Sequence, residues 1–383
     1  MHTDSHVTLL SDGPGGHRQR PRTRRIAGFV GTALIAALAL PAVAAANDGD
    51  SHRPPNQYVL HSLITDTGAG GTATDPHLVN GWGLTAGPTT PWWVADNGTD
   101  TSTLYTGTGA TIPLVVNVPG GPTGTVFNGS ATDFLVSGGG KTGPARFLFA
   151  TEGGQILGWN PTVPGAPVPS DQAFVGATTA GAIYKGLAIG TSSGHAYLYA
   201  TNFHAGRVDV FDGSFTLQTW AGAFVDPTLP ARYAPFGIQN LNGMIFVTYA
   251  RQDATKHDEI DGEGRGFVSV FATDGTFLGR VGTRDELNAP WGLAWAPADF
   301  GRFSGDLLVG NFGDGRITAF AWTSDGWRER GQLKGLDHHT VRVPGLWGIG
   351  FGNGFASGPT NTLYVVAGPN HESSGMFGSI TAN

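Results

Sequence analysis

A repeating pattern of short strands and glycine-rich turns constrains the fold of this chain more than any other feature. Its fullest copy runs from Ala289 to Phe320 and starts with a Trp-Gly-Leu segment. A buried apolar strand, Leu307-Leu308-Val309, then leads into a Gly-rich turn, and an alternating segment follows at 316–320. A further strand is predicted at 327–330, after an Asp-Gly turn. Together these segments predict one four-stranded antiparallel sheet, which cannot bury both of its faces alone.

The same order of segments recurs along the chain in six copies. The first strand of each copy contains a glycine, and successive glycines lie 46 to 57 residues apart: Gly83, Gly129, Gly186, Gly237, Gly292 and Gly348. Second- and third-strand motifs follow each glycine, such as AYLYATN and GRVDVF in the third copy. Six copies of a four-stranded unit predict an all-β, six-bladed β-propeller. A β-sandwich with chance glycine spacing is the alternative, but it does not explain three motifs recurring in order.

The two ends of the repeat region are incomplete in a complementary way. Segment 58–63 has the pattern of a strand but no partner nearby, and the sixth copy ends at 377–380 without a fourth strand. We expect the N-terminal strand to complete this last blade and close the ring, which removes exposed strand edges. Residues 57–383 are therefore predicted to form a single propeller domain, preceded by a flexible leader at 47–56.

Composition and charge exclude several classes of function. The chain has no cysteine, which excludes disulfides, thiol catalysis and cysteine-type zinc sites. The first 46 residues hold five Arg and two acidic residues, so the remaining chain carries 17 basic and 27 acidic side chains, a net charge of −10. An acidic body of this kind disfavours nucleic acid and anionic membranes as partners.

The N-terminal segment has the features of an export signal. Arg18 to Arg25 form a basic region, 26–40 is apolar, and small-residue cleavage motifs follow at 42–46. A membrane anchor is the alternative, but the apolar run is short for a span. Residues 1–46 are therefore predicted to be a cleaved signal peptide, with no stable membrane span afterwards and a secreted, extracellular mature protein. The Arg24-Arg25 pair fits a twin-arginine route poorly.

Longer motifs carry a family resemblance, namely GDLLVGNFGDGRI, KHDEIDGEGRGFV and NTLYVVAGPNHESSGMFGSI. With these, residues 58–383 closely resemble a family of uncharacterised exported bacterial propeller proteins, some of which carry a PEP-CTERM sorting tail. More broadly, the repeats resemble NHL-type propellers. No such tail precedes Asn383, so sorting by that route is not expected. The resemblance implies the fold but no activity, because the wider superfamily includes binding propellers as well as lactonase- and lyase-like enzymes.

A site is predicted at one mouth of the central channel. The first strand of each blade lines the channel of a propeller, and antiparallel pairing brings first-strand starts and second-strand ends to the same mouth. Aromatic walls with a few convergent polar groups are typical of a ligand site. The residues predicted to bind a ligand there are Trp82, Asn97, Phe236, Tyr249, Arg251, Trp291 and Trp347. The alternative for the aromatic residues is that they wedge between blades.

Metal and catalytic candidates also lie at second-strand ends. Four oxygen-bearing side chains could hold Ca²⁺ or another divalent cation: Asp96, Glu152, Asn202 and Asn311. This set loosely resembles, in residue type and blade location, the calcium site of lactonase-type propellers. His204 and His371 are candidate proton carriers. The alternatives are turn-capping Asn residues, structural His residues and a solvated acidic loop after the second strand of blade 4.

Two functions from different classes follow. The first is a secreted propeller that binds a small molecule, or an extracellular protein or glycan, at the channel mouth. The second is a divalent-metal-dependent hydrolase or lyase with the metal in the channel and His204 or His371 carrying protons. The sequence has no GxSxG, HExxH or phosphate-binding motif that would specify a reaction. A monomer is expected in either case.

The export signal makes a direct prediction about the mature chain. Because small-residue cleavage motifs end at Ala46, the secreted protein should begin near Ala45 to Asn47. N-terminal sequencing of protein recovered from the culture medium measures this start. Recovery of a chain that begins at Met1 or retains Arg25 would contradict it.

Overall fold

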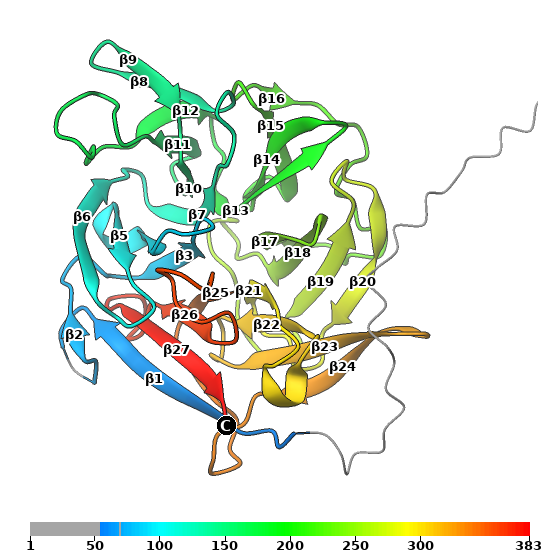
Figure 1. The fold of residues 1–383 in the computed structure, drawn as a ribbon. Helices are drawn as coiled ribbons and strands as arrows, with labels where there is room; N and C mark the ends of the chain where they lie inside the picture. Colours follow the sequence, from blue (N-terminus) through cyan, green and yellow to red (C-terminus); the bar gives the residue numbers. More distant parts are fainter. Residues whose placement is uncertain (1–53, 69) are drawn as a thin grey trace, which may run out of the picture. The chain divides into compact units, whose positions relative to one another are not determined.

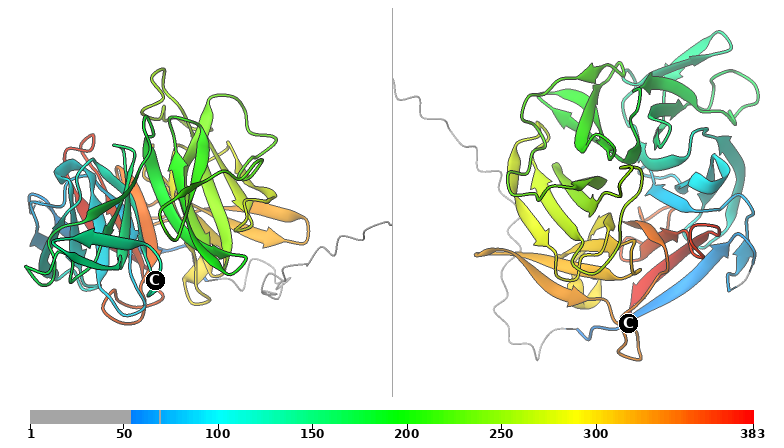
Figure 2. Two further views of the ribbon diagram at one scale, coloured as in Figure 1. Left: turned by 90° about the horizontal axis from the view of Figure 1, so that it is seen from above. Right: turned by 180° about the vertical axis from the view of Figure 1, so that it is seen from behind.

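The computed structural model describes residues 54–68 and 70–383, which form six large, mainly antiparallel sheets and a separate two-stranded hairpin. The six large sheets are arranged as blades around one axis (Figures 1 and 2), so the predicted six-bladed propeller is confirmed. The predicted signal peptide and residues 47–53 of the leader lie outside the described residues. In the described part, no helix has the length and apolar character needed to cross a bilayer.

Blades 1 to 3 cover the first half of the ring. Blade 1 contains β3 (Gly81–Thr85), β4 (Trp92–Asp96), β5 (Thr101–Tyr105) and β6 (Thr111–Asn117), with a single-turn 3-10 helix, η2 (Asn97–Thr99), after β4. Blade 2 contains β7 (Pro122–Phe127), β10 (Phe147–Thr151), β11 (Gln155–Trp159) and β12 (Phe174–Thr178). A separate hairpin, β8 (Leu135–Gly138) and β9 (Lys141–Pro144), is inserted between its first two strands. Blade 3 contains β13 (Tyr184–Ser192), β14 (His195–Asn202), β15 (Arg207–Asp212) and β16 (Leu217–Gln218).

Blades 4 to 6 complete the ring. Blade 4 contains β17 (Tyr233–Leu241), β18 (Met244–Arg251), β19 (Gly266–Phe271) and β20 (Phe277–Thr283). Blade 5 contains β21 (Pro290–Trp295), β22 (Leu307–Asn311), β23 (Ile317–Thr323) and β24 (Gly326–Gln332), with the 3-10 helix η3 (Gly301–Phe303) before β22. Blade 6 contains β25 (Leu346–Phe351), β26 (Leu363–Ala367), β27 (Met376–Ala382), β1 (Tyr58–Thr65) and the short β2 (Ala73–Thr74).

The N-terminal strand closes the ring as predicted. β1 runs antiparallel to β27, from the pair Tyr58–Ala382 to the pair Thr65–Met376, and the two strands lie side by side in Figure 1. Tyr58 also reaches blade 5, where its hydroxyl donates to the Phe300 carbonyl at 3.0 Å. Strands from both ends of the described chain therefore form blade 6 together, and this blade contacts blade 5 through Tyr58.

Apolar side chains fill each space between neighbouring blades. Six hydrophobic clusters each combine residues of two adjacent blades, and a seventh surrounds the axis. Between blades 1 and 2, for example, Trp93 stacks on Phe147 with ring centroids 4.0 Å apart. Each sheet thus buries both faces against its neighbours, which a single four-stranded sheet cannot do alone.

A ring of glycines brings the six first strands together at the axis. A Cβ added to Gly83 would lie within 3.0 Å of the Thr123 carbonyl oxygen in the next blade, and one on Gly237 would meet the Trp291 carbonyl equally closely. A backbone atom of the next blade lies this close at every blade boundary, for Gly83, Gly124, Gly186, Gly237, Gly292 and Gly348. Glycine recurs at this position because backbone meets backbone and leaves no space for a side chain.

The structure corrects one repeat assignment. The glycine of blade 2 is Gly124 in β7, and the predicted Gly129 lies after that strand, on the way to the inserted β8–β9 hairpin. β7 pairs with β10 through Phe127–Phe147, which fixes its place in the blade. The motif was missed because Pro122-Thr123-Gly124 has no aromatic residue before the glycine and the insertion lengthens the blade.

The glycine ring can be tested with two matched substitutions. Gly237→Ala should destabilise the protein by about 2 kcal/mol or more, because the new methyl group overlaps backbone that cannot move without its blade. Gly279→Ala in β20 should stay within about 0.5 kcal/mol of the wild type, since no atom lies within 4 Å of a Cβ built there. Urea unfolding measures both, and equal stabilities of the two variants would contradict the close-packed ring.

Candidate functional site at the channel mouth

The six residues that directly precede the ring glycines lie at one mouth of the channel. In order around the ring these residues are Trp82, Thr123, Lys185, Phe236, Trp291 and Trp347. Lys185 is the one charged residue among the six, and its side chain is only 1% exposed. The mouth therefore combines aromatic residues with a buried cation.

The aromatic residues pack on one another and plug the channel. Trp347 is fully buried between Trp82 and Phe312, with ring centroids at 3.8 and 3.9 Å. Phe236 lies against the same tryptophan at 5.7 Å. Trp291 stays partly exposed, and its Nε1 donates to the Lys185 carbonyl at 2.8 Å. Trp82, Phe236 and Trp347 thus build the floor of the mouth and offer little free surface to a ligand.

Lys185 is held by carboxylates and by an aromatic face. Its Nζ lies 2.5 Å from Glu152 Oε1 and 3.1 Å from Asp258 Oδ1, and 4.9 Å from the centre of the Trp82 ring. Burial lowers the pKa of Lys185, but the nearby Glu152, Glu259 and Asp258 outweigh it and raise the pKa above the usual value. Lys185 is therefore an ammonium ion at neutral pH and not a nucleophilic amine.

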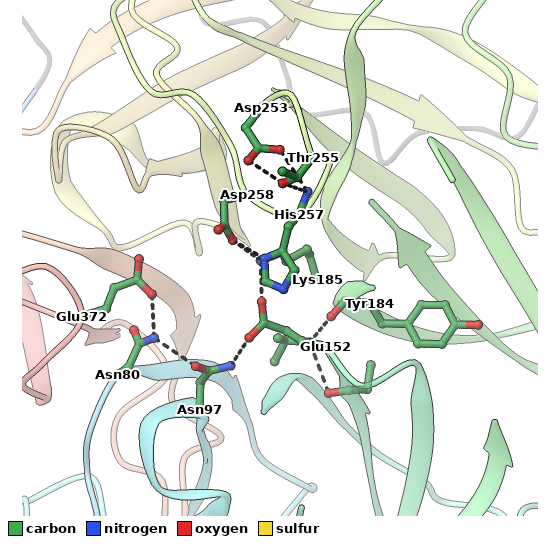
Figure 3. A network of polar contacts seen from close by, with 12 residues as sticks. Asn80, Asn97, Glu152, Tyr184, Lys185, Asp253, Thr255, His257, Asp258 and Glu372 are labelled. Carbon is green, nitrogen blue, oxygen red and sulfur yellow. Dashed lines mark hydrogen bonds and ion pairs between the residues drawn. The ribbon is translucent and has the colours of Figure 1, made fainter. Parts of the chain in front are cut away.

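Hydrogen bonds extend this network around the mouth, as Figure 3 shows. Glu152 Oε2 accepts from Asn97 Nδ2 at 2.9 Å, and Asn97 Oδ1 accepts from Asn80 Nδ2 at 3.2 Å. Asn80 Nδ2 also donates to Glu372 Oε2 at 2.8 Å. With Lys185 and Asp258, side chains associated with five of the six blades form one connected polar network.

The loop that supplies Asp258 is a folded hairpin. Beyond β18 the chain turns back, with a bridge between Gln252 and Glu259 and a backbone hydrogen bond from Ile260 to the Arg251 carbonyl at 2.7 Å. Burial raises the pKa of Asp258, but Lys185 and His257 outweigh it and hold the pKa below its usual range. The ion pair to Lys185 therefore ties the loop of blade 4 to the axis.

The four predicted metal ligands do not share one network. Asn202 Nδ2 donates to Asp209 at 2.8 Å, and Asn311 bonds backbone groups of Glu286 and Asn288. Asp96 is fully buried, and burial raises the pKa of its carboxyl well above the usual value. Three of the four thus serve their own blades or the loops beside them, and Glu152 alone reaches the network at the mouth.

A different set of side chains has metal-like spacing. Ligand atoms of Glu152, His257 and Asp258 lie within 4.8 Å of one another, and His257 Nδ1 is 2.8 Å from Asp258 Oδ1. Both carboxylates already contact the Lys185 ammonium. A cation at this place would have to compete with Lys185, since both need the same oxygen atoms.

The remaining candidates lie in varied places. Asn97 belongs to the network, whereas Tyr249 is buried in the core between blades 3 and 4. Arg251 ends β18 and is half-buried. His204 is exposed in the turn after β14, and His371 lines a groove at the mouth. Asn97 and His371 therefore lie at the mouth itself.

This groove is a cavity of about 510 Å³ beside the network. It is lined from blades 4, 5 and 6, and includes Glu259, Phe312, Pro369, His371 and Glu372. The channel itself offers only about 20 Å³ behind the aromatic floor. A larger hollow of about 540 Å³ lies on the opposite face, beside the β8–β9 hairpin and away from this network. A ligand at the mouth would therefore occupy the groove and not the channel.

Sequence reasoning missed Lys185, Asn80 and Glu372. The signal for Lys185 was present, because it alone places a charge before the glycine, where four of the other recognised copies have Trp or Phe. Asn80 lies before a first strand and Glu372 in a loop after β26, so their contact depends on how blades 1 and 6 meet. Such contacts between distant residues are fixed by the closed ring.

Glu259 gives the mouth a measurable pH dependence. Burial raises the pKa of Glu259 from 4.5 to about 7, with Glu372 and Asp258 adding to the rise and Lys185 opposing it. A raised pKa means that stability is lost as this carboxyl ionises, between about pH 4.5 and 7. Glu259→Gln should therefore be more stable than the wild type at pH 8, by on the order of 1 kcal/mol, and should lose this advantage below pH 4.5.

Thermal melts of both proteins across this pH range measure the difference. Glu263→Gln, an exposed substitution in the same loop with the same change of charge, is the control and should show no such trend. A difference between Glu259→Gln and the wild type that is independent of pH would show that Glu259 ionises normally.

Comparison with known proteins identifies relatives and the fold. No family model matches the chain. Among solved structures, the ring resembles the soluble aldose sugar dehydrogenase from Escherichia coli, with a TM-score of 0.52 and 14% identity over 85% of this chain and 100% of that chain. A streptogramin B lyase structure has a TM-score of 0.47 and 12% identity over 85% and 97%. At 14% identity the likeness to the dehydrogenase shows the fold alone.

Two viral proteins are similar in sequence. The uncharacterized protein R648 of Acanthamoeba polyphaga mimivirus is 31% identical over 283 residues, covering 70% of this chain and 68% of that protein. The uncharacterized protein L690 of the same virus is 32% identical over 278 residues, covering 69% and 71%. The resemblance to exported bacterial propellers stays a prediction. The chain therefore belongs to the same family as these two uncharacterized mimivirus proteins.

Proposed function

We propose that this protein is an exported binding propeller that holds a ligand at the mouth of its channel. The observation that carries the proposal is the network around Lys185, which draws polar side chains from five blades to the edge of a 510 Å³ groove. Cavities of about 300–1,000 Å³ with apolar walls and a few fixed polar groups are typical of small-molecule sites. Similar relatives are uncharacterized and supply no activity of their own.

The geometry favours binding over catalysis by Lys185. A nucleophilic lysine needs a lowered pKa, whereas the pKa of Lys185 is raised by its carboxylate neighbours. The aromatic floor also separates the groove from the narrow channel, so a ligand would rest on the mouth. These features describe a pre-organised surface that holds its polar groups in fixed positions.

The proposed location of the protein and the class of its ligand follow from the N-terminal segment and from the net charge of the remaining chain. The basic, apolar and small-residue order of 1–46 supports export, and the net charge of −10 on the remainder disfavours nucleic acid. The ligand is then a small molecule or a group of an extracellular protein or glycan. The protein would act as a monomer, since the ring closes within one chain.

A thermal-shift screen of cationic, anionic and neutral metabolites tests binding at the mouth. Hits should lose at least half of their shift in Glu372→Gln or His371→Ala, which alter the groove. They should keep it in Gln239→Ala, which lies at the far end of the channel in a cavity of about 270 Å³. Hits that respond only to Gln239→Ala, or a screen without hits, would refute the mouth as the binding site.

One observation supports the metal-dependent enzyme as a second candidate. Glu152, His257 and Asp258 could together ligate Ca²⁺ or another divalent cation, and His371 could carry protons from the nearby groove. Metal analysis of the purified protein distinguishes the two candidates. One divalent ion per chain that is lost in Glu152→Gln would favour the hydrolase or lyase, whereas a metal-free protein that keeps its ligands would favour binding.

A further inference from the structure

The mouth already holds one ammonium group, that of Lys185, and the contacts of this group show which side chains can bind such a cation. The Lys185 ammonium lies over the Trp82 ring and between Glu152 and Asp258, with its side chain 1% exposed. Carboxylates on one side and an aromatic face on the other are the groups with which proteins recognise organic ammonium ions. The Lys185 ammonium forms ion pairs with Glu152 and Asp258. The carboxylates that line the groove have no such partner among the described residues.

Two of those carboxylates belong to Glu259 and Glu372. Both line the groove, and neither forms an ion pair with a residue at 54–68 or 70–383. Glu372 accepts one hydrogen bond, from the uncharged Asn80. Asp261 also lines the groove, and the neighbouring Arg265 donates to its backbone carbonyl at 2.6 Å. This contact leaves the Asp261 carboxylate without an ion pair to a described residue, so the groove contains three carboxylates that a positive ligand could neutralise.

The other walls of the groove indicate the body of the ligand. Phe312, Pro344 and Pro369 give apolar surface, and glycines between them leave space for it. The lining contains no Lys or Arg that could pair with an anion. Glu259 and Glu372 are also outside the group of closely spaced metal ligands among the described residues, which argues for a larger cation than a metal ion.

From these contacts we infer that the groove binds an organic ammonium ion whose charge meets Glu259 and Glu372 and whose apolar part lies against Phe312. The inference rests on the proposed binding function and adds the chemical class of the ligand. A free amine and the side chain of a lysine in a peptide offer the same chemistry. The volume of about 510 Å³ accommodates either one.

Isothermal titration calorimetry with 2-phenylethylammonium at pH 8 tests the inference on the mature protein. The probe should bind at one saturable site, whereas neutral 2-phenylethanol and anionic 3-phenylpropionate should bind at least about tenfold more weakly, because they cannot form the charged contacts. Glu372→Gln and Glu259→Gln should each weaken the probe by about tenfold. Glu263→Gln, with the same change of charge outside the groove, should leave its affinity unchanged.

The outcomes separate this inference from the proposed function. Equal affinity for the alcohol, equal losses in Glu263→Gln and Glu372→Gln, or no saturable heat would overturn the ammonium site. If anions or sugars from the thermal-shift screen still bind at the mouth, the binding function survives that failure. Binding of Nα-acetyl-lysine methylamide as tightly as the free amine would identify lysine side chains as a source of the ligand, and its failure to bind would restrict the ligand to small amines.

Discussion

Close approach of the six first strands at the axis is the constraint on which the rest of this structure depends. At each blade boundary a glycine faces backbone of the next blade, as Gly237 faces Trp291 and Gly348 faces Trp82. Because this ring has no space for side chains, it fixes the distance and angle between blades. The interblade cores then fill the wedges further out, and residues before the glycines meet at the mouth.

The residue before the ring glycine differs from blade to blade, so the mouth is not symmetric. Four blades place Trp or Phe before the glycine, but blade 3 places Lys185 there and blade 2 places Thr123. A buried ammonium costs several kcal/mol in lost hydration, which only well-placed charges and hydrogen bonds can offset. Glu152 and Asp258 provide those charges, and Asn97 and Asn80 continue the network to Glu372. One substitution in a repeated motif therefore creates the electrostatic centre of the protein.

The ends of the second strands show how similar positions acquire different roles. Asn202 and Asn311 satisfy both their donor and acceptor groups with nearby protein atoms. Asp96 accepts from the Thr101 hydroxyl at Oδ2 at 3.4 Å, whereas its buried Oδ1 has no hydrogen-bond partner among the described residues. Glu152 lies one residue beyond the end of its strand, and this step carries its longer side chain toward the axis. The direction and length of each side chain, more than its residue type, therefore decide which oxygen atoms reach the network at the mouth.

The sequence by itself determined the repeat, its number of copies and the closing strand, because glycine turns and strand alternation are local patterns. It also placed Glu152, Asn97 and the aromatic floor at one mouth, since strand direction alternates along the chain. Only the tertiary structure decided that Asp96, Asn202 and Asn311 serve their own surroundings and that Lys185 lies between Glu152 and Asp258. Those contacts join residues from different blades, and their geometry exists only after the ring has closed.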